Sequence, residues 1–198
     1  MNVTSATTKV RELLGLDLEA FGECVARAPL GAEGVMALPF FNGERVPALP
    51  HASASFVGMT SLNTTRDNLC RAVVEGTTFG LRYGFERLGD LASRASQVRL
   101  VGGGAKSPVW RQIVADVLDV DVICPRITEA AALGGAIQAA WCDTLARGTG
   151  ESLSALTERL VEVDLDTLTR PRGEPVRRYQ ELYQRYRQAL AERYDVAP

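Results

Sequence analysis

The chain has 198 residues, of which 46% are hydrophobic and 23% are charged, and its formal net charge at pH 7 is −2. A chain of this length and composition can bury a sizeable core, which excludes a disordered or fibrous protein. The weak negative charge provides no basic field for nucleic acid or for an anionic membrane surface, so neither is expected as a partner.

The four cysteines, Cys24, Cys70, Cys124 and Cys142, form no C-x-x-C pair, and His51 is the only histidine. A zinc site is therefore not expected. Isolated cysteines in apolar stretches are typical of small buried side chains in a reducing compartment. The first residues lack the apolar run of a signal peptide, and no stretch approaches the roughly 20 apolar residues of a membrane span. We therefore expect a cytoplasmic protein.

Helical spacing of apolar residues predicts two short helices, over residues 4–14 and 18–28. An apolar run over 35–41 predicts a buried strand, and the residues that follow it, 42–47, are typical of a turn. A looser alternation over 53–59 predicts a second strand.

A long helix is predicted from Arg66 to about Leu88, with Thr64 or Thr65 as its N-cap. Three glycines within it are spaced four residues apart and so share one face, where we expect a neighbouring element to approach closely. These are Gly76, Gly80 and Gly84.

A third strand over 98–101 leads into a glycine-rich segment, after which Ser107 and Pro108 are typical of the N-cap and first residue of a helix. A fourth strand is predicted over 120–124. Two further helices are predicted, over 129–145 with Thr128 as N-cap and over 152–160. The last helix, 176–193, has an apolar and aromatic stripe that we expect to pack on the domain: Val176, Tyr179, Tyr183, Tyr186 and Leu190.

Strands that alternate with helices predict an α/β fold, with all four strands in one central sheet. The strand–helix–strand unit over 98–124 predicts that its two strands are parallel. Trp110 and Trp141 are expected in the core, and His51 on the surface. Asp116, Asp119 and Asp121 are interpreted as solvated residues at helix ends and turns.

The strongest local signal is the glycine-rich segment Gly102-Gly-Gly-Ala-Lys-Ser107. Glycines at a strand end let a ligand approach the backbone, and the helix behind them presents free N–H groups, so the segment suits a nucleotide. A dinucleotide fingerprint fits poorly because Ser107 stands at the third glycine position, and a P-loop is excluded because Leu100 and Ala105 replace both of its glycines. A purely structural turn stays open as an alternative.

Four segments in order resemble the C-terminal domain of the FGGY carbohydrate kinases, and within that family the xylulokinases. The first is Leu38-Pro-Phe-Phe-Asn-Gly-Glu-Arg-Val-Pro47. The second is a discontinuous pattern that consists of residues 55–59, Asn68-Leu69 and Ala72-Val-Val-Glu75. The third is 102–113 and the fourth is Glu129-Ala-Ala-Ala-Leu-Gly-Gly-Ala-Ile137, the helix that connects the two domains in that family. The similarity covers nearly the whole chain.

The resemblance implies an actin-like, ribonuclease-H-like ATPase fold with a mixed sheet flanked by helices. Residues 1–198 would be the C-terminal nucleotide-binding domain, with 1–30 as a helical lead-in and 175–198 as a helix packed back on it. The partner would be an N-terminal, sugar-binding domain that is absent from this chain and that carries the catalytic base. With ATP and Mg²⁺, the two halves would phosphorylate D-xylulose to xylulose 5-phosphate in xylose metabolism. The alternatives are another FGGY kinase, acting on a different ketose or a polyol, and a non-catalytic nucleotide-binding module.

By the same resemblance, no catalytic or metal-binding residue is expected in this chain, which alone would be inactive. Adenine and ribose would lie on Gly102, Gly103, Gly104 and Ala105. Lys106 and Ser107 are expected at ribose or phosphate, although Ser107 could instead only cap its helix. A second candidate region is the turn with Asn42, Glu44 and Arg45, which either faces the cleft or is a structural anchor. The small-residue face of 129–136 is expected to be exposed without the partner domain, and could support a homodimer.

Overall fold

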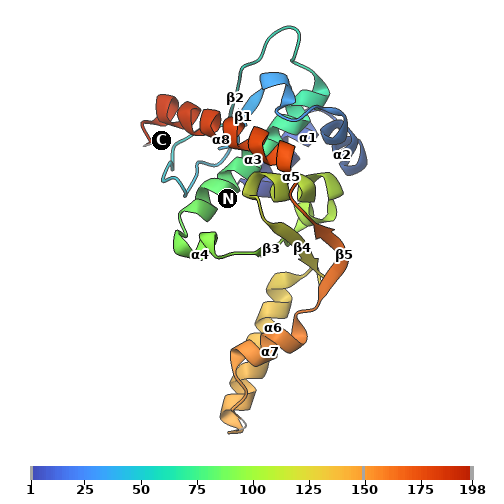
Figure 1. Cartoon of the computed structure of the whole chain (residues 1–198), viewed down its shortest axis with the longest axis vertical. Helices are drawn as coiled ribbons and strands as arrows, with labels where there is room; N and C mark the ends of the chain where they lie inside the picture. Colours follow the sequence, from blue (N-terminus) through green and yellow to red (C-terminus); the bar gives the residue numbers. More distant parts are fainter. Residues whose placement is uncertain (1, 149, 197–198) are drawn as a thin grey trace.

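A long helix, α3 (Arg66–Glu86), runs through the centre of the molecule and the other elements of the body pack around it (Figure 1). The computed structural model describes residues 2–148 and 150–196. Thr65 caps α3, because its side chain accepts a hydrogen bond from the Asn68 amide, and every residue from Cys70 to Phe79 is buried. No helix of the described part has the length and apolarity that crossing a membrane requires.

Four helices pack against α3. α1 and α2 come from the start of the chain, α5 from its middle, and α8, near its end, crosses the body (Figure 1). α1, α2 and α8 were predicted with boundaries within a few residues of those observed, and the start of α5 was predicted at Pro108. Their bounds are α1 (Val3–Leu13), α2 (Leu18–Arg27), α5 (Pro108–Leu118) and α8 (Gly173–Tyr194).

The strands form two separate sheets, which corrects the prediction of one central sheet. β1 (Met36–Leu38) and β2 (Ser55–Val57) pair antiparallel, with Ala37 opposite Phe56. β3 (Gln97–Arg99) pairs parallel with β4 (Asp121–Pro125), as predicted, and β5 (Val163–Thr169) pairs antiparallel with β4. The second sheet is therefore mixed. Short helical turns complete the body at η1 (Ala32–Gly34), α4 (Asp90–Ser93) and η2 (Gly103–Lys106).

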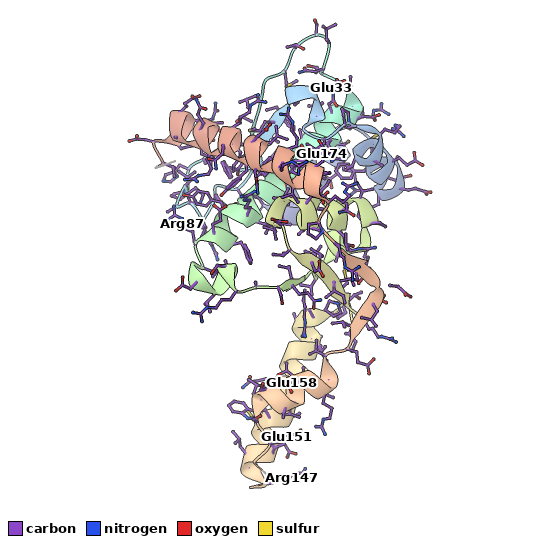
Figure 2. All side chains as sticks on the ribbon, in the orientation of Figure 1. Glu33, Arg87, Arg147, Glu151, Glu158 and Glu174 are labelled. Carbon is purple, nitrogen blue, oxygen red and sulfur yellow. The ribbon has the colours of Figure 1, made fainter. Side chains whose placement is uncertain are left out.

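Two helices, α6 (Ala130–Ala146) and α7 (Leu153–Leu160), form an arm that extends away from the body (Figure 1). The arm leaves the sheet at the end of β4 and returns into β5. Arg147, Glu151 and Glu158 mark it in Figure 2. Ile137 is the buried residue of α6. The small-residue face of α6 is thus exposed, as expected. Contrary to prediction, Thr128 does not cap α6, Trp141 is only half-buried and Cys142 is exposed.

The aromatic stripe of α8 is buried, as predicted, and surrounds one residue of α3. The ring centroid of Phe79 lies 6.1, 5.9 and 5.5 Å from those of Tyr179, Tyr183 and Tyr186. Such aromatic contacts add to the free energy gained by burying the rings. The stripe therefore fixes the C-terminal helix on the central one.

Asp116 is not the solvated residue that the sequence analysis expected. Its side chain is fully buried on α5 and accepts hydrogen bonds from Arg172 Nη2 at 2.7 Å and from the Arg172 amide at 2.8 Å. Gln112 Nε2 donates to the same carboxylate at 3.0 Å. Because a buried carboxylate needs such partners, Asp116 anchors the segment that leads into α8.

Candidate nucleotide site

The glycine-rich segment makes a sharp bend between β3 and α5. Leu100 still belongs to the sheet through its amide, which donates to the Ile123 carbonyl at 2.9 Å. Gly102 then adopts a φ of +90°, a conformation that side chains other than glycine rarely allow, and η2 follows at once. Ser107 accepts a hydrogen bond from the Trp110 amide at 3.3 Å and so caps α5, as predicted. The bend brings the loop and the N-terminus of α5 together.

Trp110 forms the floor beneath the loop. Its indole Nε1 donates to Thr78 Oγ1 at 3.1 Å, and the Thr78 hydroxyl donates to the Val74 carbonyl at 2.7 Å. A Cβ on Gly104 would lie 2.8 Å from the Trp110 ring, so only glycine lets the loop rest on this ring. On Gly103, by contrast, the nearest atom to a Cβ would be Thr4 Cγ2, at 3.8 Å. Gly103 therefore faces open space.

That open space is a cavity of about 570 Å³, here called the main cavity. Its volume lies within the range of about 300–1,000 Å³ that is typical of small-molecule sites. The loop and α5 form its floor, with Gly103, Gly104, Lys106, Ser107, Pro108 and Trp110. Two helices form its walls: α1 with Thr4, Thr7, Thr8 and Arg11, and α2 with Leu18, Glu19, Phe21, Gly22 and Val25.

The sequence analysis missed both walls. The signal was present in α1, because Thr4, Thr7, Thr8 and Arg11 recur at i, i+3, i+4 and i+7 and so form one polar face. That face lines the main cavity, whereas Leu13, one of the apolar residues whose helical spacing predicted this helix, is 83% exposed.

The predicted nucleotide residues divide into two groups. Gly103, Gly104, Lys106 and Ser107 line the main cavity. Gly102 instead supplies the bend, and Ala105 is buried beneath the loop. The Ala105 carbonyl accepts hydrogen bonds from Arg111 Nη1 at 2.7 Å and from Cys124 Sγ at 3.7 Å, which holds the loop on α5 and β4.

The α2 wall is held on α3 by charged contacts. Arg27 binds both carboxylate oxygens of Asp67, with Nε–Oδ2 at 2.9 Å and Nη2–Oδ1 at 3.0 Å. These hydrogen bonds hold the pKa of the Asp67 carboxyl below its usual value. Deeper in the interface, Arg71 Nη1 donates to the Val25 carbonyl at 3.1 Å. The distance between α2 and the loop is therefore set by contacts outside the cavity.

The turn with Asn42, Glu44 and Arg45 does not reach the main cavity. Glu44 and Arg45 line a smaller cavity of about 200 Å³ on the other side of the first turn of α1. Asn2 fixes this turn: its Nδ2 donates to the Gly43 carbonyl at 2.6 Å and to Glu44 Oε2 at 3.0 Å, and its Oδ1 accepts from the Asn42 amide at 3.3 Å. The start of α1 thus separates the two predicted regions.

The main cavity carries the cations Arg11 and Lys106 and one carboxylate, Glu19. Within residues 2–148 and 150–196, no cluster of three or more His, Cys, Asp or Glu side chains could hold a metal ion. The residues that line the main cavity form a slot with a glycine floor and a helix N-terminus, which suits a nucleoside.

The chain is similar to known proteins in sequence and in fold. The model of the C-terminal domain of the FGGY family of carbohydrate kinases matches residues 7–142. The xylulose kinase of Haemophilus influenzae is 47% identical over 194 residues, which are 98% of this chain and 38% of that relative.

Solved structures of carbohydrate kinases are similar to this chain over nearly its whole length. The xylulose kinase of Lactobacillus acidophilus has a TM-score of 0.85 at 26% identity, over 98% of this chain and 39% of its own. The gluconate kinase of the same organism has a TM-score of 0.84 at 26% identity, with the same two coverages. The chain spans about two-fifths of the length of these relatives. The fold is that of the actin-like ATPases, and the chain belongs to the FGGY family of carbohydrate kinases.

Proposed function

We propose that this chain is the ATP-binding half of a sugar kinase, which transfers the γ-phosphoryl group of ATP to D-xylulose. The main cavity carries the proposal, because it combines an open glycine backbone at Gly103, a capped helix N-terminus at Ser107 and enough volume for a nucleoside. The ribose would lie over Gly103 and Gly104, with Lys106 and Ser107 beside it. The 47% identity to a xylulose kinase supports the choice of xylulose as acceptor.

The proposal assigns the catalytic base and the sugar site to an N-terminal domain outside this chain. Phosphoryl transfer requires that nucleotide and acceptor be positioned together, and a base must lie within hydrogen-bonding reach of the acceptor hydroxyl. The proposal gives this chain the nucleotide alone, and no magnesium ligand. The exposed face of α6 would pack on that domain. We place the reaction in the cytoplasm, since the cysteines are free thiols.

The direct test is nucleotide binding by the 198-residue chain, followed through the fluorescence of Trp110 at the cavity floor. Gly103→Val would place a branched side chain in the cavity where nothing now blocks it, and we expect ADP affinity to fall about 100-fold, equivalent to about 2.7 kcal/mol. Gly84→Val is the matched control, because a Cβ there also meets open space but lies on α3 outside the cavity. If the folded Gly103→Val variant bound ADP as tightly as the unmodified chain does, the assignment would be refuted.

A second experiment tests the reaction. The chain is mixed with the remaining part of the Haemophilus influenzae relative, and ADP release is measured with ATP, magnesium and either xylulose or gluconate. We expect turnover with xylulose only in the mixture, and loss of that turnover in Gly103→Val. Gluconate is the second acceptor to test, because the Lactobacillus acidophilus gluconate kinase matches the fold as well as the xylulose kinase does.

A further inference from the structure

Arg11 lines the main cavity about two helical turns along α1 from Thr4. Thr4, on the same face of α1, marks the end near the glycine-rich loop, because its Cγ2 is the closest atom to the open face of Gly103. Arg11 lies seven positions after Thr4, which corresponds to about 10 Å along the helix axis at about 1.5 Å per residue. This distance is comparable to the length of a nucleoside.

The guanidinium of Arg11 has no hydrogen-bond partner within the part of the chain that the structure describes. Its Nε is buried without a hydrogen bond, and within residues 2–148 and 150–196 its side chain forms no ion pair. The neighbouring carboxylate of Glu12 binds Lys9 instead, at 3.1 Å. Glu19, which also lines the cavity, forms no ion pair with Arg11 either. A half-buried cation without a partner is costly, so a group that enters the cavity can supply what the fold does not.

The opposite wall, on α2, carries Glu19 but is otherwise apolar, and it contains a gap. Leu18 and Phe21 of α2 line it, and Gly22 has nothing within 4 Å of the position where its Cβ would be. The slot between α1 and α2 is therefore lined by aliphatic and aromatic side chains and an open strip on α2, and by Arg11 on α1. A guanidinium is planar and stacks on aromatic rings, so this arrangement suits a flat heterocycle.

The electrostatics of the cavity determine the orientation in which a nucleotide would bind. The N-termini of α1, near Thr4, and of α5, capped by Ser107, both lie at the loop end. Helix N-termini favour anionic groups, so the phosphates belong at this end and the base at the other.

We propose that Arg11 recognises the nucleobase, by stacking on the ring or by donating to it across the slot from Phe21 and Gly22. This inference rests on the proposed nucleotide-binding function and adds a specificity-determining residue to it. In this role Arg11 differs from the many arginines that bind phosphate groups.

The test compares two ligands that share the base and differ in the phosphates, adenosine and ADP, by calorimetry on the 198-residue chain. Arg11→Met keeps most of the apolar stem and removes the planar cation, and Arg11→Lys keeps the charge but not the plane. We expect both variants to bind adenosine and ADP about tenfold more weakly, with the same factor for the two ligands. Arg94→Ala, at an exposed position outside the cavity, is the control and should bind both normally. Circular dichroism confirms that each variant is folded.

Three other outcomes overturn the inference. A loss for ADP with normal adenosine binding would make Arg11 a phosphate ligand. Normal binding of both ligands, with binding still abolished by Gly103→Val, would remove Arg11 from the site but keep the proposed function. If the unmodified chain binds neither ligand, the proposed function fails, and the inference fails with it.

Discussion

The Tyr179 hydroxyl donates a hydrogen bond of 2.8 Å to Glu75 Oε1, which joins α8 to α3 across 104 residues of sequence. The same hydroxyl accepts from Arg71 Nη2 at 2.7 Å, and Arg71 Nε also binds Glu75 Oε1, at 2.6 Å. All three side chains are buried. Burial raises the pKa of the Tyr179 hydroxyl, which favours the protonated form that donates to Glu75.

Tyr179→Phe should destabilise the chain by about 1–3 kcal/mol, because it leaves buried donor and acceptor groups on Arg71 and Glu75 without a partner. Tyr186→Phe is the matched control, since the Tyr186 hydroxyl is buried and has no hydrogen-bond partner among residues 2–148 and 150–196. Its loss should be neutral or slightly stabilising. Urea unfolding of the two variants measures the difference. Similar stabilities would mean that the Tyr179 hydrogen bonds contribute nothing net.

Gly76→Ala and Gly84→Ala should have opposite effects, although both glycines lie on α3. A Cβ on Gly76 would collide with the Ala37 carbonyl oxygen of β1, whereas one on Gly84 would meet nothing within 4 Å. We expect Gly76→Ala to cost about 3 kcal/mol through overpacking. Gly84→Ala should stabilise by about 0.5–1 kcal/mol through helix propensity. Thermal denaturation of both variants checks the signs, and a stable Gly76→Ala protein would contradict the close approach of α3 to β1.

The Arg27–Asp67 pair predicts a dependence of stability on pH. The pKa of Asp67 is lowered in the folded protein, so its contribution is present above the unfolded value of about 3.9 and is lost as pH falls through the folded pKa. The stability difference between the native chain and Asp67→Asn should thus be constant from pH 6 to 8 and shrink below about pH 4. Asp166→Asn, at an exposed position without an ion pair to a described residue, should show no such trend. A difference that grows in acid would reverse the assigned sign.

The cysteines should differ in reactivity toward iodoacetamide. Burial raises the pKa of Cys70 to about 12 and also raises that of Cys24, so both remain thiols and are shielded. Cys142 is exposed on α6. Peptide mapping at pH 8 should therefore find Cys142 labelled first, with Cys24 and Cys70 labelled only on unfolding. Labelling of Cys70 as fast as Cys142 would show that the α2–α3 interface opens readily.

The helices and strands were predicted from the sequence more accurately than the contacts between them. Apolar runs identified the segments around β1, β2, β3 and β4, but periodicity does not say which strands pair, and α3 and α5 lie between the two sheets. β5 was missed because it is half-exposed, with Leu165 at 71%, and becomes a strand by pairing with β4 about 40 residues earlier. Asp116 was misjudged because its partner Arg172 is 56 residues away.

The candidate site was predicted on one side only. Glycines mark a loop in the sequence because few other residues allow its backbone, so Gly103 and Gly104 could be found directly. The walls are ordinary helices, and their role depends on where α1 and α2 pack. Asn2, which fixes the second predicted loop, carries no local signal at all, since its partners lie about 40 residues away.

The α6–α7 arm is a single insertion in the chain between two neighbouring strands of one sheet. Pro125, the last residue of β4, pairs with Val163, the first residue of β5, so the two ends of the arm are already adjacent. A hairpin loop of two to five residues is the usual link between such strands. The arm is consequently a replaceable module: residues 126–162 can be exchanged for a tight turn, or for the arm of a relative, while the sheet, the glycine-rich loop and the aromatic core retain their covalent connections.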